Sequence, residues 1–150
     1  MQLQSAPHGC GPAAIANALE ALGNRVSQDA AATLARTDAE GTDERGIKRA
    51  LRMLGFAPQE FSTGDRSAAW HLVCGALLMG YPCLLAVDND SHWVTALGLL
   101  GGMVLVVDSA DGGLIQSLEQ RALLQRWGSR ASRKKPQTFY GISIHPSHPR

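Results

Sequence analysis

Hydrophobic positions follow a helical spacing in the first half of the chain and form short unbroken runs in the second half. In the first half the spacing predicts four helices, and Gly23, Gly55 and Gly80 are placed to end three of them. The expected elements are a helix up to Leu22, a helix over 30–36 capped by Asp29, a helix over 47–54, an extended segment over 56–61 and a helix over 67–79.

The second half predicts mainly strands. The expected elements are strands over 82–87, 93–100, 103–107 and 138–144, and a helix over 117–127 that starts with a capping-box sequence. Because Gly101-Gly102 joins two apolar runs, these runs should form an antiparallel hairpin. The fold class is therefore α+β, with an N-terminal helical half packed on a C-terminal, mostly antiparallel sheet. We expect one domain over residues 1–144 and a loose tail over residues 145–150.

The predicted hairpin brings two polar residues together. His92 precedes its first strand and Asp108 follows its second, and these two positions are neighbours in an antiparallel pair. The two legs are unequal in length, so the pairing needs a bulge or an offset. A carboxylate beside an imidazole fixes the tautomer of the ring and stabilises its protonated form.

Cys10 lies at the start of the first predicted helix. The positive end of the helix dipole favours a thiolate over a thiol, and the thiolate is the nucleophile. Cysteine, histidine and aspartate in this order, each at the edge of an apolar element, suggest a thiol site in which His92 is the base and Asp108 orients it. The side-chain amide of Gln4 and the backbone N–H of Cys10 are candidate donors to an oxyanion.

Residues beside these four are candidates for substrate contact. Gly9 and Gly11 flank the cysteine and leave room for a substrate backbone to approach the sulfur. Ser91 and Trp93 flank the histidine and are expected to contact the substrate as well.

Composition excludes several other classes of protein. A net charge of +1 provides no global attraction to nucleic acid or to an anionic membrane. The three cysteines contain no CxxC pair, which argues against a disulfide framework and against a thiolate zinc site, and we expect no metal and no cofactor. Cys74 and Cys83 lie in apolar surroundings and are expected to be buried.

The expected location is the cytoplasm. The N-terminus lacks the pattern of a signal peptide, and the apolar runs are too short to span a bilayer, although export by a dedicated secretion system stays open. A basic cluster that begins at Arg126 and includes Arg130, Lys134 and Lys135 is expected to be a solvated loop, because no aromatic residues interleave with it.

The segment from Gln4 to Ala14, with glutamine six residues before cysteine and Gly-Pro-Ala after it, resembles the papain-like peptidases that process bacteriocins at double-glycine leaders. Four later segments are similar in the same order: Gly41-Thr42, His92-Trp93-Val94, Val107-Asp108-Ser109 and Trp127-Gly128. The resemblance implies a stand-alone papain-like cysteine peptidase with Cys10, His92 and Asp108 as its triad and Gln4 in the oxyanion hole. It also implies a thioester acyl-enzyme and a peptide or protein substrate.

Two alternatives stay open at this point. The Gln-Ser-x-Pro-x-x-Cys-Gly start also resembles phytochelatin-synthase-like enzymes, which would make the chain an acyl transferase or amidase acting on glutathione-type substrates. The other alternative is a peptide-binding domain that has the fold without the chemistry. The sequence specifies neither the cleavage site nor the oligomeric state.

Overall fold

The computed structural model describes residues 9–110, 113–130, 132 and 134–147. Its helices are α1 (Cys10–Ala21), α2 (Gln28–Ala35), α3 (Glu44–Met53), α4 (Arg66–Leu78) and α5 (Gln120–Trp127). Its strands are β1 (Phe56–Thr63), β2 (Cys83–Val87), β3 (His92–Leu100), β4 (Met103–Val107), β5 (Ile115–Leu118) and β6 (Phe139–Pro146).

The strands form one antiparallel sheet in the order β1-β6-β2-β3-β4-β5. The hairpin predicted at Gly101-Gly102 is confirmed as β3 and β4, and both glycines have positive φ angles. A shift of register between Ala96 and Gly98 places a bulge in β3. This bulge accommodates the unequal legs of the hairpin, so that Thr95 pairs with Val107 and Asp108 follows directly.

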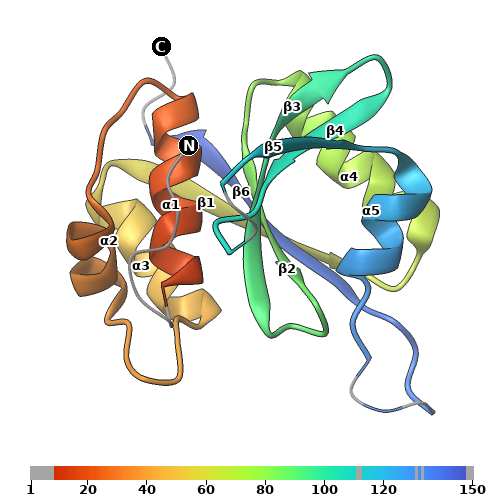
Figure 1. Cartoon of the computed structure of the whole chain (residues 1–150), viewed down its shortest axis with the longest axis horizontal. Helices are drawn as coiled ribbons and strands as arrows, with labels where there is room; N and C mark the ends of the chain where they lie inside the picture. Colours follow the sequence, from red (N-terminus) through yellow and green to blue (C-terminus); the bar gives the residue numbers. More distant parts are fainter. Residues whose placement is uncertain (1–8, 111–112, 131, 133, 148–150) are drawn as a thin grey trace.

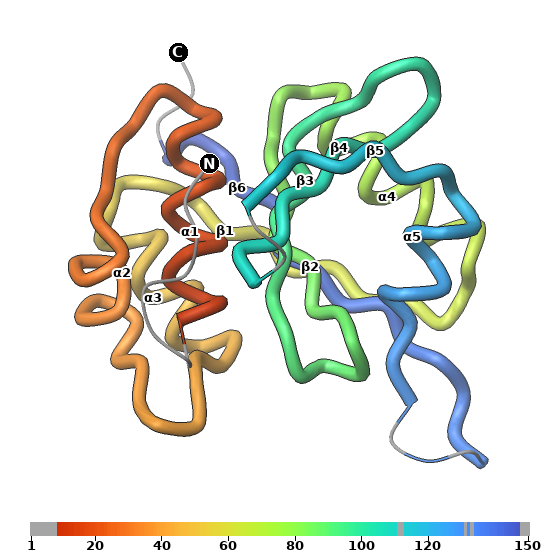
Figure 2. Tube along the Cα trace, in the orientation of Figure 1, coloured from red at the N-terminus to blue at the C-terminus, as the bar shows by residue number. Residues whose placement is uncertain are grey.

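Helices cover both faces of the sheet, as Figures 1 and 2 show. On one face α1, α2 and α3 build a core with Ile15, Leu19 and Leu51 against Leu84 and Ile142 of the sheet. On the other face α4 and α5 build a second core, which includes Val73, Leu85, Val94, Trp127 and Phe139. Every residue of β2 is buried because both layers cover this central strand.

The fold class predicted from the sequence is confirmed, with two differences in the arrangement of its halves. The helical half contributes β1, which pairs with β6 at one edge of the sheet. It also contributes α4, which packs on the face opposite α1. The sheet therefore lies between two helical layers instead of beneath a single one.

Three local predictions were wrong. Residues 115–118 form β5, so the expected helix begins only at Gln120, and the cap position is taken by Glu119 without a side-chain hydrogen bond. The cap of α2 is Ser27, whose hydroxyl accepts the N–H of Ala30, and not Asp29, which lies in the first turn. The last strand continues through Pro146, two residues past the expected end.

Candidate active site

Cys10 is the first residue of α1. The preceding residue, Gly9, is the N-cap and has no side chain that could satisfy the free N–H groups of the first turn. Pro12 also lies in this turn, where its missing N–H breaks no helical hydrogen bond. The N–H groups at the start of α1 therefore place partial positive charge close to the sulfur.

The pKa of the Cys10 thiol lies below its ordinary value. Burial of the side chain raises this pKa, but a hydrogen bond with the side chain of His92 and backbone N–H groups of Trp93 and Gly11 lower it more. All of these contacts favour the thiolate, which makes Cys10 the chemically activated cysteine of the chain.

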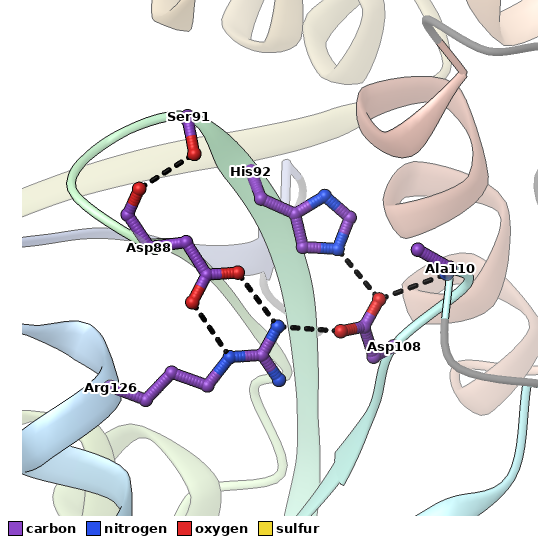
Figure 3. Close-up of polar contacts among 6 residues, drawn as sticks. All are labelled: Asp88, Ser91, His92, Asp108, Ala110 and Arg126. Atoms are coloured by element: carbon purple, nitrogen blue, oxygen red, sulfur yellow. Dashed lines mark hydrogen bonds and ion pairs between the residues drawn. The ribbon is translucent and has the colours of Figure 1, made fainter.

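His92 is the first residue of β3, and its side chain is 14% exposed. Its Nε2 lies 2.6 Å from Oδ1 of Asp108 (Figure 3). Nδ1 is therefore left for the hydrogen bond with Cys10. The bond to Cys10 raises the pKa of His92 to about 9, burial opposes this rise, and the Asp108 carboxylate adds to it. At neutral pH the ring is therefore held as an imidazolium between the Cys10 sulfur and the Asp108 carboxylate.

Asp108 follows β4, and its side chain is 7% exposed. Burial raises the pKa of this carboxyl group, but hydrogen bonds from Arg126, His92 and the backbone N–H of Ala110 hold it below its ordinary value. The carboxylate therefore stays ionised beside the imidazolium ring. The bulged hairpin brings this pair together at the end of β3 that faces the start of α1 (Figure 3).

Arg126 is a member of this cluster that the sequence pattern did not indicate. It lies in the last turn of α5 with its side chain 29% exposed, and its guanidinium bonds both Asp108 and Asp88. The expectation of a solvated basic loop is therefore wrong for Arg126, although Arg130 is exposed. A usable signal was its place directly before Trp127, at the border of the buried face of a helix.

The other candidate residues have different surroundings. Gln4 lies outside the described residues, so its placement beside Cys10 stays a prediction. Ser91 is exposed, and its hydroxyl donates to the carbonyl of Asp88. Trp93 is 8% exposed, and its Nε1 donates to the carbonyl of Thr42 at 3.0 Å, which joins β3 to the loop before α3.

The two glycines beside the cysteine are both buried. A Cβ atom on Gly11 would lie 2.7 Å from Cβ of Thr42, so the close packing of α1 against the loop before α3 requires glycine there. This packing is a different reason for glycine from the expected access of a substrate backbone.

The three cysteines are free thiols, and the pKa of the other two is raised where that of Cys10 is lowered. Burial raises the pKa of Cys74, and burial together with the nearby Cys74 raises that of Cys83. Within the described part of the chain, no group of three or more His, Cys, Asp or Glu side chains is placed to hold a metal ion.

A cleft of about 800 Å³ lies between the loop before α3 and the sheet, and none of Cys10, His92, Asp108 and Arg126 is among the residues that line it. Its walls include Thr42, Trp93, Asp90 and Tyr140. Two of its lining residues, Asp90 and Trp93, lie close to His92 in the sequence.

Comparison with known proteins identifies the family. The sequence model of the Peptidase C39 family matches residues 1–131. The chain belongs to the Peptidase C39 family of cysteine peptidases. This C39 chain is 25% identical over 135 residues to the lactococcin-G-processing and transport ATP-binding protein LagD of Lactococcus lactis subsp. lactis, covering 90% of the chain and 18% of LagD. The chain thus spans about a fifth of the length of this relative.

Solved structures share the fold of this C39 chain. The peptidase domain of Streptococcus ComA, a bifunctional ABC transporter, superposes with a TM-score of 0.71 at 18% identity and covers 97% of this chain and 96% of that domain. A double glycine motif protease from an AMS/PCAT transporter, solved with the leader peptide, gives a TM-score of 0.69 at 15% identity, with 96% and 89% coverage. The papain-like peptidase fold predicted from the sequence is confirmed by these matches.

None of the described helices combines the length and the apolar character that a bilayer span requires.

Proposed function

We propose that this C39 chain cleaves peptide bonds through a Cys10–His92–Asp108 triad and a thioester acyl-enzyme. The observation that carries the proposal is the continuous series of hydrogen bonds from the thiol at the start of α1 through His92 to Asp108. The directions of the pKa shifts support it, because the thiol pKa is lowered and the imidazole pKa is raised.

In the first half of the reaction, the Cys10 thiolate attacks the scissile carbonyl carbon, and the carbonyl electron pair moves onto oxygen. The backbone N–H of Cys10 and the amide of Gln4 are the proposed donors to this oxyanion. The C–N bond then breaks, and the His92 imidazolium gives its proton to the leaving amine, which leaves a thioester on Cys10 and a neutral ring.

In the second half, the neutral His92 takes a proton from water while the water oxygen attacks the thioester carbonyl. The tetrahedral intermediate collapses with loss of the Cys10 thiolate, and the carboxylic acid product leaves. Asp108 fixes the ring and stabilises the imidazolium in both halves without exchanging a proton itself.

The proposed substrate is a peptide with a double-glycine leader. LagD is described as lactococcin-G-processing, and the AMS/PCAT protein as a double glycine motif protease in complex with its leader peptide. The cleft lined in part by Trp93 supports a peptide substrate, because it provides space for an extended chain on the surface that includes the neighbour of His92.

Site-specific alkylation tests the chemistry without knowledge of the substrate. Iodoacetamide should label Cys10 at neutral pH much faster than Cys74 or Cys83, because its pKa alone is lowered. Equal and slow labelling of all three thiols would contradict the proposed nucleophile.

Peptide hydrolysis tests the substrate. The wild-type chain should cleave after Gly-Gly in a leader peptide, and Cys10→Ala should not. A matched peptide with Ala-Ala in place of Gly-Gly should be resistant. Cleavage of both peptides at equal rates would exclude double-glycine specificity, and a conjugate formed with an added amine would indicate acyl transfer instead of hydrolysis.

A further inference from the structure

The guanidinium of Arg126 lies between two carboxylates that belong to different parts of the sheet. Its Nη2 donates to Oδ2 of Asp108 at 2.6 Å and to Oδ2 of Asp88 at 2.9 Å, and its Nε donates to Oδ1 of Asp88 at 3.1 Å (Figure 3). The planar fork of arginine matches this arrangement, because a lysine ammonium is a point charge and cannot hold a carboxylate through two fixed donors.

The first carboxylate, that of Asp108, has both of its oxygens engaged. Oδ1 accepts the imidazole Nε2 of His92 and the backbone N–H of Ala110, and Oδ2 accepts Arg126. The side-chain torsion of a free carboxylate is broad, so these contacts on opposite oxygens determine which way the group faces. At 7% exposure, water has little access to replace a lost donor.

The second carboxylate, that of Asp88, belongs to the turn that leads into His92. Asp88, Asn89 and Asp90 have φ angles of 52°, 60° and 62°, a left-handed conformation that is unfavourable for residues other than glycine. Such a turn persists when tertiary contacts hold it.

These contacts come from the end of α5 and the residues after it. The backbone N–H of Asp88 donates to the carbonyl of Arg126 at 3.2 Å. The Ser129 hydroxyl donates to Asp90 at 2.9 Å, and the backbone N–H of Arg130 donates to Asn89 at 2.8 Å. Residues 126–130 thus hold the turn before His92 in place. Arg126 of the same segment also binds Asp108, the carboxylate that contacts the His92 ring.

We infer that Arg126 is a positioning residue of the thiol site, which orients His92 through Asp108 and fixes the start of β3 through Asp88. This inference rests on the proposed Cys10–His92–Asp108 chemistry. The groups that face Asp108 are His92 on β3 and Arg126 on α5, with Asp88 behind the arginine and Cys10 beyond the histidine. Without the fork, the Asp108 carboxylate is free to rotate away from the ring. The imidazolium and the thiolate paired with it are then stabilised less.

The test compares Arg126→Met and Arg126→Lys with Arg121→Met, a matched control at an exposed position of the same helix. Arg126→Met should lower kcat on a double-glycine leader peptide by about 10–100-fold, the usual effect of losing an outer-shell partner, with KM unchanged. The acid limb of Cys10 alkylation by iodoacetamide should move to higher pH. Arg126→Lys should recover only part of kcat, and Arg121→Met should match the wild type.

Three outcomes would overturn the inference. A lower melting temperature with wild-type kcat and an unmoved acid limb would make Arg126 only a tether between α5 and the sheet. Full recovery by Arg126→Lys would show that charge suffices without the fork. If Arg126→Met does not fold, Asp88→Asn is tested in its place. This substitution replaces one of the two carboxylates that the Arg126 guanidinium binds, and it should lower kcat by less than the loss of Arg126. Unchanged kcat in both Asp88→Asn and Arg126→Lys would then overturn the inference.

Failure of the proposed function would look different from failure of this inference. Turnover that survives Cys10→Ala, or wild-type Cys10 that reacts no faster than Cys83, would remove the thiol mechanism itself. A wild-type chain that passes both controls while all Arg126 variants behave as wild type would refute only the positioning role.

Discussion

Each face of the sheet carries a core and at least one cysteine, and the cysteines of the two faces differ in chemistry. Burial acts to raise the pKa of Cys10, the first residue of α1, and of Cys83, the first residue of β2. At Cys10, contacts with His92 and with backbone N–H groups reverse this effect, whereas the thiol of Cys83 donates to the carbonyl of Tyr81, which stabilises the protonated form. Burial raises the pKa of both thiols, and the neighbours of each cysteine determine whether that rise is overcome.

Substitution of Cys10 and of Cys83 by alanine should give the largest difference in kcat/KM between the two faces. Cys10→Ala should lower kcat/KM on a leader peptide by at least about 10⁴-fold, because the remaining site keeps only binding and oxyanion contacts. Cys83→Ala should leave kcat/KM unchanged and cost about 1 kcal/mol of the free energy of unfolding, measured by urea denaturation. A Cys83→Ala variant as inactive as Cys10→Ala would break the distinction between the faces.

The next contrast concerns the partner of His92. Asp108→Asn keeps the size of the side chain but replaces the carboxylate by a neutral amide, so the imidazolium loses its counter-charge. We expect a loss of about 10²-fold in kcat, smaller than in a serine enzyme because a thiolate is intrinsically nucleophilic. Asn89→Ala removes the bond of the nearby turn with Arg130 without removing a contact to His92, and is the control for a loss of local structure. Equal effects of the two substitutions would argue that Asp108 acts only on local structure.

Much of the α1 face could be predicted from the sequence because its signals are local. The Gly-Gly turn indicated the β3–β4 hairpin, and the ends of its two strands were enough to predict that His92 and Asp108 are neighbours. The glycines after α1, α3 and α4 marked where those helices end. Each signal lies within a few residues of the element it determines.

The α5 region was harder to predict because its determinants are distant in the sequence. Ser117 to Gln120 resembles a capping box, but pairing of Ser117 with Leu105 makes Ser117 and Leu118 part of β5. Arg126 looks like one member of a basic run until the fold brings Asp88 and Asp108 to it. Tertiary pairing overrode the local pattern in both cases.

The pH dependence of activity also distinguishes the Cys10 site from Cys83. The pKa of His92 is raised to about 9, so the imidazolium that protonates the leaving amine is lost as pH rises through this value. We therefore expect kcat/KM to fall on the alkaline side with an apparent pKa near 9 and a limiting slope of about tenfold per pH unit. Alkylation of Cys83 should instead increase only at high pH, because its thiol pKa is raised. An alkaline limb near the ordinary imidazole pKa would contradict the pairing of His92 with Cys10 and Asp108.

The smallest expected effects concern a glycine in a helix on each face. Gly11 in α1 packs against Thr42, and a Cβ atom there would lie 2.7 Å from the Thr42 Cβ, so Gly11→Ala should cost about 1–3 kcal/mol of the free energy of unfolding. Gly75 in α4 is exposed, and a Cβ atom there would have no neighbour within 4 Å, so Gly75→Ala should stabilise the chain by about 0.5–1 kcal/mol.

Thermal and urea denaturation of the two glycine variants measure this difference directly. Gly11→Ala also displaces the first turn of α1, so alkylation of Cys10 should slow with the loss of stability, whereas Gly75→Ala should leave it unchanged. If both variants are stabilised, the contact between α1 and Thr42 is looser than the structure describes. The thiol then depends less on the packing of its helix than on His92.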